Sequence, residues 1–228
     1  MHDDSHHHGL PHDLKVLHRR QLLRLTAGVG VMTLFACSDD GSAIDETGAT
    51  TDNTTGDSPT GGGSCPSIPE ETAGPYPGDG SNGANALVLT GIVRSDIRTS
   101  IADASGTADG VPLTITLTIV DSTCTPLANH AVYLWHCDRD GAYSMYTGSA
   151  SAENYLRGVQ ETDADGKVTF LSIFPACYSG RWPHIHFEVY PSLAATADAG
   201  NKLRTSQLAL PKATCDLVFA TAGYEASV

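Results

Sequence analysis

Basic residues are scarce in this chain, which has 13 Lys or Arg against 26 Asp or Glu in 228 residues and a formal net charge of −13. A nucleic-acid-binding surface needs clustered positive charge to neutralise phosphates, and this composition offers none. The acidity therefore argues against nucleic acid as a partner. It identifies no substrate, because a negative surface also serves solubility.

Closely spaced cysteine pairs are also absent. None of the six cysteines has the C-x-x-C spacing of zinc ribbons and thioredoxin-like redox motifs, which argues against both classes. Export would favour disulfides. Cys137 with Cys177 and Cys124 with Cys215 are two hypotheses for the pairing, since connectivity does not follow from sequence.

The N-terminal segment of the chain has the pattern of an export signal followed by a lipid-attachment site and a linker. Arg19 and Arg20 precede a modest apolar stretch at 25–36, which is too short to span a bilayer and predicts an export signal. The paired arginines resemble a twin-arginine signal, and an ordinary Sec signal is the alternative. Leu34-Phe35-Ala36-Cys37 resembles a lipobox, in which Cys37 would be lipidated.

Residues 38–64 are Asp, Gly, Ser and Thr with almost no large apolar side chain, so they cannot bury enough surface to offset their ordering entropy. The predicted organisation is therefore a signal segment at 1–37, a disordered linker at 38–64 and one domain at 65–228. The predicted location is outside a bacterial cytoplasm, in the periplasm or at the cell surface, with a membrane tether through lipidated Cys37.

The domain lacks a long helical periodicity and an internal repeat. At 111–120, apolar residues alternate with threonines, which is the period of a half-buried strand. Short strands bounded by Gly and Asp turns predict an all-β fold, a β-sandwich of mainly antiparallel strands. The expected strands are 87–94, 111–120, 131–137, 167–174, 184–190 and 206–210.

Two histidines alternate along the strand predicted at 184–190. Residues two apart in a strand point to the same side, so His184 and His186 present two imidazoles together while Ile185 and Phe187 face the core. Imidazole binds Zn, Cu, Ni and Fe, so the pair alone does not select a metal. Two surface histidines without a metal are the alternative explanation.

Two tyrosines adjoin this pair in the predicted topology. Tyr143 follows the strand at 131–137, and Tyr178 lies in the turn before the histidine strand. A phenol with a reference pKa near 10 becomes a ligand only when a highly charged hard cation such as Fe(III) displaces its proton. Either tyrosine could instead cap the edge of a sandwich.

Motifs along the domain resemble the intradiol ring-cleavage dioxygenases, the catechol and protocatechuate 3,4-dioxygenase family, and particularly their exported single-chain relatives. They include GPYP at 74–77, LWHCD at 134–138, DGAYS at 140–144, YSGR at 178–181, PHIHF at 183–187 and TSQL at 205–208. Each motif alone is weak, but together they run in order over most of the domain.

The resemblance implies one mononuclear non-haem Fe(III) held by Tyr143, Tyr178, His184 and His186. It implies that Tyr178 leaves the metal and takes a substrate proton, that Arg181 stabilises developing charge, and that Gln207 orients Arg181 or the bound oxygen species. It places Gly74, Pro75 and Tyr76 in the substrate pocket. Only five residues separate Tyr178 from His184, fewer than in protocatechuate enzymes, so substrate preference does not carry over.

The implied activity is cleavage of a catechol-type ring with O2 to a muconate-type diacid. An exported, non-enzymatic β-sandwich lipoprotein used for adhesion or ligand binding is the alternative, and it predicts no coloured iron centre. A protein holding Zn or Cu through His184 and His186 alone is a third possibility. It predicts that Tyr143 and Tyr178 can be changed without loss of metal.

Overall fold

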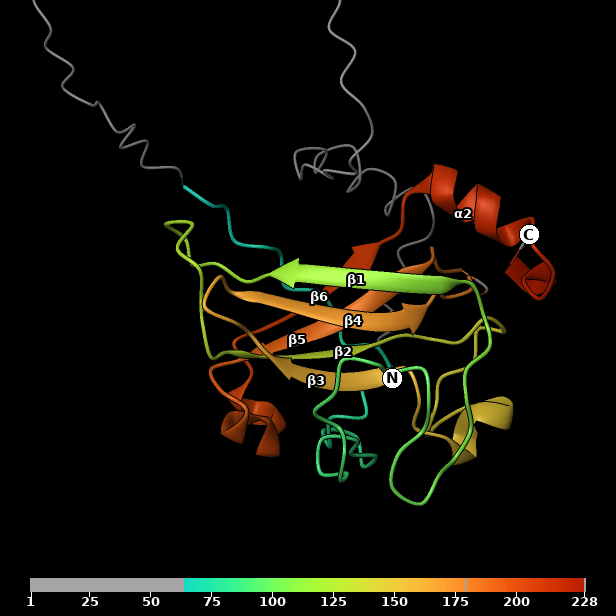
Figure 1. The fold of residues 1–228 in the computed structure, drawn as a ribbon, viewed down its shortest axis with the longest axis horizontal. Helices are drawn as coiled ribbons and strands as arrows, with labels where there is room; N and C mark the ends of the chain where they lie inside the picture. The colour runs from blue at the N-terminus through green and yellow to red at the C-terminus, as the bar shows by residue number, and fades with distance from the viewer. Residues whose placement is uncertain (1–63, 179, 228) are drawn as a thin grey trace, which may run out of the picture.

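A computed structural model describes residues 64–178 and 180–227 (Figure 1). The export signal predicted at 1–37, the twin arginines, the lipobox at Cys37 and nearly all of the linker predicted at 38–64 lie outside the described residues. No helix among the described residues is long and apolar enough to cross a membrane. The strands are β1 (Pro112–Thr118), β2 (Ala131–Trp135), β3 (Arg157–Glu161), β4 (Lys167–Ile173), β5 (His184–Tyr190) and β6 (Arg204–Ala209).

Among residues 64–178 and 180–227, helical structure is confined to short segments between and after the strands. The single α-helix of the described part, α2 (Lys212–Phe219), lies at one end of the molecule beside the C-terminus (Figure 1). The 3₁₀ helices are η1 (Gly148–Ala152), η2 (Ala194–Ala197), η3 (Ala199–Asn201) and η4 (Glu225–Ser227).

The strands form two antiparallel sheets, which confirms the predicted all-β sandwich. One sheet pairs β1 with β4, and the other has the order β3-β2-β5-β6. Apolar side chains from both sheets form one core cluster, in which Ile115 and Phe170 from the first sheet join Leu134 and Phe187 from the second. The threonines of β1 that alternate with this core face solvent.

The four-stranded sheet is buried on its other face as well. All residues of β2 and β5 are buried. Tyr133, Trp135 and Tyr190 point away from the sandwich core into a second cluster, together with Leu87 and Ile92 from the segment that precedes β1. This second layer matters for function, because the histidines of β5 point into it.

The prediction of a strand at 87–94 was wrong. This segment consists of turns with one isolated bridge, from Val93 to Val159. Gly91 has a positive φ of 91°, which breaks the extended path, and Leu87 and Ile92 are still buried. Burial in a second layer thus produced an apolar pattern without a strand. Strand β3 was missed, because the sequence around Gly158 and Gln160 lacks clear alternation.

A disulfide joins Cys65 to Cys124, so the predicted pairing of Cys124 with Cys215 was wrong. Cys137 and Cys177 do not pair with each other and are free thiols, as is Cys215. The backbone explains the observed pair, because the amide of Cys65 donates to the carbonyl of Ser122 at 3.0 Å, which brings the start of the domain against the turn after β1.

We expect this disulfide to contribute about 4 kcal/mol to the free energy of unfolding, because it closes a loop with a sequence separation of 59 residues. Urea denaturation with and without a thiol reductant measures the contribution. Reductant should lower the midpoint of the wild-type chain and leave that of a Cys65→Ser/Cys124→Ser variant unchanged. Equal stability of the oxidised and reduced wild-type chains would contradict the expectation.

Candidate metal centre

The two histidines of β5 project from the sheet on the face opposite the sandwich core. His184 and His186 are buried, and their Nε2 atoms lie 3.0 Å apart. Nδ1 of His184 lies 2.5 Å from the carbonyl of Trp182, which can only accept, so Nδ1 carries the proton and Nε2 presents a lone pair. A second hydrogen bond that sets the tautomer in this way is typical of histidines that bind metals.

The indole of Trp135 orients His186. The two residues are partners in the β2–β5 register, and their rings stack with centroids 4.9 Å apart and an interplanar angle of 5°. Nδ1 of His186 has no hydrogen-bond partner within the described part of the chain. Stacking therefore takes the place of the hydrogen bond that fixes the ring of His184.

Both predicted tyrosines reach the same point from loops. Oη of Tyr143 lies 3.4 Å from Oη of Tyr178, and also 3.4 Å from Nε2 of His184 and of His186. Oη of Tyr178 is 3.4 Å from Nε2 of His184. The structure thus brings together all four side chains that the sequence singled out.

The spacing of these four atoms fits one metal ion better than it fits a hydrogen-bond network. Separations of 3.4 Å are long for O–H···N bonds, whose donor and acceptor usually lie within about 3.2 Å. Donor atoms that share one first-row metal ion at about 2 Å stand roughly 3 Å apart from each other. Among the described residues, no cluster of three or more His, Cys, Asp or Glu has the arrangement of a metal site. The atoms that adjoin the histidine pair are the phenol oxygens of Tyr143 and Tyr178.

Burial controls the protonation of all four groups. It lowers the pKa of His184 to about 4 and that of His186 well below its usual value, so both imidazoles are neutral at pH 7. Burial also raises the pKa of Tyr143 and Tyr178, and the positive charge of Arg181 only partly offsets this. The phenols become phenolates only if a strongly charged cation lies beside them, which favours a hard trivalent ion over Zn or Cu.

Arg181 and Gln207 form a second unit beside the four donors. Nη2 of Arg181 donates to Oε1 of Gln207 at 2.6 Å. Gln207 is the partner of His186 in the β5–β6 register, and its Nε2 donates to the carbonyl of Thr72 at 2.9 Å. Gln207 thereby holds Arg181 and also the segment that leads to Gly74. No signal in the sequence indicated the second of these links.

The predicted pocket residues Gly74, Pro75 and Tyr76 lie against the same site. A Cβ on Gly74, whose φ is +69°, would stand 3.5 Å from Cε1 of His186. The carbonyl of Pro75 accepts a hydrogen bond from Asn82 at 2.9 Å, and the ring of Tyr76 lies 5.0 Å from that of Tyr143. This segment therefore lies against His186 and Tyr143.

Sequence reasoning gave no role to Trp135 or Arg157, both fully buried beside the site. The signal for Trp135 was its place in the LWHCD motif. Arg157 had no local signal, because its partners are distant in sequence.

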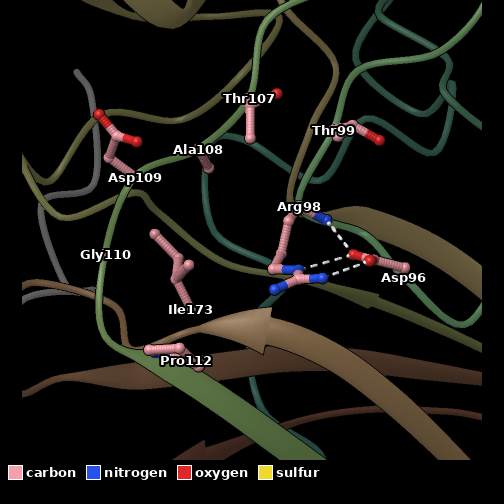
Figure 2. Close-up of a pocket in the computed structure, with 9 residues that line it drawn as sticks. All are labelled: Asp96, Arg98, Thr99, Thr107, Ala108, Asp109, Gly110, Pro112 and Ile173. Carbon is pink, nitrogen blue, oxygen red and sulfur yellow. Dashed lines mark hydrogen bonds and ion pairs between the residues drawn. The ribbon is translucent and has the colours of Figure 1, made fainter.

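A shallow pocket of about 330 Å³ near the Arg98–Asp96 ion pair contains none of the donor residues, and Figure 2 shows it lined by Thr99, Thr107 and Asp109 among others.

The class that fold and site define is a β-sandwich with a centre of two histidines and two tyrosines. Residues 92–195 match the model of a family described as dioxygenase (Dioxygenase_C). An intradiol ring-cleavage dioxygenase from Tetranychus urticae is 29% identical, with a TM-score of 0.52 over 71% of this chain and 72% of that chain. Catechol 1,2-dioxygenase 2 from Acinetobacter lwoffii is 36% identical over 93 residues, 41% of this chain.

The chain is similar to the intradiol ring-cleavage dioxygenases, which is the resemblance that its motifs predicted. The match to catechol 1,2-dioxygenase 2 spans 33% of that relative's length. These relationships do not favour the alternative of a non-enzymatic adhesion or ligand-binding lipoprotein.

A third buried histidine provides a test of the electrostatics near the centre. His136 lies between Cys137 O and Ser172 Oγ, each 2.7 Å from a ring nitrogen, and burial lowers its pKa to about 4. The unfolded chain binds a proton at this histidine below about pH 6.5, whereas the folded chain does so only near pH 4. Its neutral state therefore stabilises the fold above that window, and the contribution is lost as pH falls through it.

We expect the free energy of unfolding of chelator-treated protein to fall between pH 6.5 and 4, with His136 contributing up to about 3 kcal/mol of the change. Urea denaturation across this range measures the slope. A His136→Gln variant should show a shallower slope whatever its stability at pH 7. Parallel curves for the two proteins would show that His136 is protonated as readily in the folded chain as in the unfolded one.

Proposed function

We propose that this protein is a non-haem Fe(III) dioxygenase that cleaves the ring of a catechol-type aromatic with O2 to a muconate-type diacid. The convergence of two phenol oxygens and two imidazole nitrogens on one point carries the proposal. Similarity to the intradiol ring-cleavage dioxygenases supports it. A bound Fe(III) would act as a Lewis acid that lowers the pKa of the phenols and of a chelating catechol.

His184, His186 and Tyr143 would hold the metal throughout. The two imidazoles are neutral donors held by Trp182 and Trp135, and Tyr143 is only 1% exposed. Tyr143 also has its amide bonded to Thr147 Oγ1 at 2.8 Å, which anchors its loop. Such fixed donors suit a template that orients a substrate without moving.

Tyr178 differs from Tyr143 in a way that suits a proton acceptor. It is only partly buried, in a short loop between β4 and β5. A phenolate at Tyr178 would accept one of the two substrate hydroxyl protons at Oη as the catechol binds. Its position next to Arg181 would limit the cost of carrying negative charge at that oxygen before the proton arrives.

Arg181 would stabilise negative charge that develops on the substrate during ring cleavage. Its hydrogen bond to Gln207 and the bond from Gln207 to Thr72 hold the guanidinium in place. A preorganised cation in a buried site stabilises such charge without reorganisation. Gly74, Pro75 and Tyr76 would form the wall that the ring contacts, with Tyr76 on the side of Tyr143.

The wider setting also remains a proposal. We infer a signal at 1–37, a linker at 38–64 and a catalytic domain at 65–228, with export to the periplasm or cell surface and a lipid tether at Cys37. The arginine pair and the lipobox-like segment support this inference. A catechol-type molecule and O2 are the proposed partners.

The visible spectrum of the iron-loaded protein tests the proposed function. We expect a broad phenolate-to-iron band, because Tyr143 and Tyr178 would both hold the iron, and a shift of that band when catechol is added without oxygen. Full iron occupancy without such a band would remove both tyrosines from the site and overturn the intradiol chemistry. Consumption of O2 with formation of a ring-opened diacid completes the test.

Two phenylalanine variants serve as matched controls for the spectrum. Tyr143→Phe removes the more buried phenol and should weaken or abolish iron binding. Tyr178→Phe should retain iron, keep one phenolate band and slow turnover. A protein that binds metal through the histidines alone would keep its metal in both variants.

Replacement of Arg181 tests charge stabilisation separately from metal binding. We expect Arg181→Ala to keep its iron and lose about 10²- to 10³-fold in kcat, the cost of removing one preorganised stabiliser. Steady-state kinetics and iron analysis measure the two quantities. Arg98→Ala, which removes a surface guanidinium paired with Asp96, is the control and should retain activity. Full activity in Arg181→Ala would exclude the assigned role.

A further inference from the structure

Arg157 is a buried cation without a carboxylate partner in the described part of the chain. It begins β3, is 1% exposed, and makes no ion pair with any described residue. Burying a charge is costly unless hydrogen bonds satisfy it. A core position at the start of a strand would ordinarily hold an apolar side chain, so this arginine calls for a specific reason.

Every N–H group of the guanidinium has an oxygen partner. Nη1 donates to Pro77 O at 2.8 Å and to Tyr133 Oη at 3.0 Å. Nη2 donates to Tyr76 O at 3.0 Å and to Ser144 O at 2.9 Å, and Nε donates to Ser144 Oγ at 3.0 Å. Arginine has five N–H donors in a rigid plane, so this set uses them all.

The acceptors come from three segments that are distant in sequence. Tyr76 and Pro77 end the segment proposed to line the substrate pocket, Ser144 follows the proposed iron ligand Tyr143, and Tyr133 belongs to β2. Tyr133 also donates its own hydroxyl hydrogen to Pro77 O at 2.7 Å. One planar group therefore sets the distance between the pocket segment and the loop of the iron ligand.

The surroundings fit closely around this group. A Cβ on Gly78, whose φ is +63°, would lie 2.7 Å from Nη1, so a larger residue here would displace the guanidinium. Cζ of Arg157 lies 5.4 Å from the centre of the Tyr146 ring, a cation–π distance. The ring of Tyr76 in turn lies 5.2 Å from that of Tyr146 and 5.0 Å from that of Tyr143.

We infer that Arg157 is a positioning residue that holds the Tyr76 wall of the substrate pocket at a fixed distance from Tyr143. We call the five hydrogen bonds from Arg157 to the three segments the clamp. The inference about substrate binding rests on the proposed function, whereas the clamp does not. Lysine at this position would keep the charge but could not replace the five bonds, because its three donors sit on one nitrogen and are not spread over a guanidinium plane. Arg157→Lys therefore separates geometry from charge.

Hydrogen exchange of the purified full chain tests the clamp without reference to turnover. In Arg157→Lys, we expect amide exchange at Gly78, which donates to Tyr146 Oη, and at Thr147, which donates to Tyr143 O, to accelerate by about tenfold or more. Exchange at Phe170, in the sandwich core, should stay unchanged. Arg98→Lys, at the surface, is the matched control and should leave all three amides unchanged.

Kinetics of the iron-loaded variants test the consequence for substrate. We expect Arg157→Lys to retain iron, to raise KM for catechol about tenfold and to change kcat less, since the pocket wall moves while the ligands remain. If Arg157→Lys does not fold, Tyr133→Phe carries both tests. It removes one acceptor of the clamp and should give smaller changes in the same direction.

The outcomes distinguish this inference from the proposed function. Unchanged exchange at Gly78 and Thr147 in a folded Arg157→Lys protein would overturn the clamp, even if the wild-type chain cleaves catechol. Accelerated exchange with an unchanged KM would remove the link to substrate binding. The third outcome is accelerated exchange in Arg157→Lys together with no phenolate-to-iron band in the iron-loaded wild-type protein. It would refute the proposed dioxygenase activity and leave the clamp valid.

Discussion

Strand β5 is buried on both faces, and the alternation of its side chains separates the sandwich core from the candidate metal centre. Ile185, Phe187 and Val189 enter the sandwich core, while His184 and His186 point into the opposite layer. Because the period of a strand is two, a slip of one residue would turn the histidines into the sandwich core and the apolar side chains toward the candidate metal centre. Antiparallel pairing with β2 and β6 prevents that slip and also sets Trp135 and Gln207 on either side of His186.

The second layer buries charged side chains, which lose their hydration, and the structure compensates for this loss in two ways. Lys202 lies between the buried carboxylates of Asp79 and Glu188, at 2.8 and 2.9 Å. Arg157 instead bonds only neutral oxygens. Ion pairing suits Glu188, which follows the histidines on the same face of β5. Neutral oxygens suit a cation that must join three backbone segments, since carbonyls are available on every residue.

The parts of the fold that the sequence predicted are those with local signals. Alternating residues at 111–120 became β1, and the histidine strand was predicted at the bounds of β5. The segment at 87–94 was not a strand, because a layer that covers a sheet needs buried apolar residues as much as a strand does. The pairing of Cys65 with Cys124 was missed because the two residues lie 59 positions apart, and no local pattern joins them.

For the candidate site, the sequence by itself determined the donor types and, through the period of a strand, the pairing of His184 with His186. It also carried enough family pattern to name Tyr143, Tyr178, Arg181 and Gln207. Only the tertiary structure decided that the four donor atoms lie 3.0 to 3.4 Å apart in most of their pairs, and that Trp135 and Arg157 hold their surroundings. Ring stacking and a five-bond guanidinium depend on residues brought together by sheet register and loop packing, and no local pattern encodes those contacts.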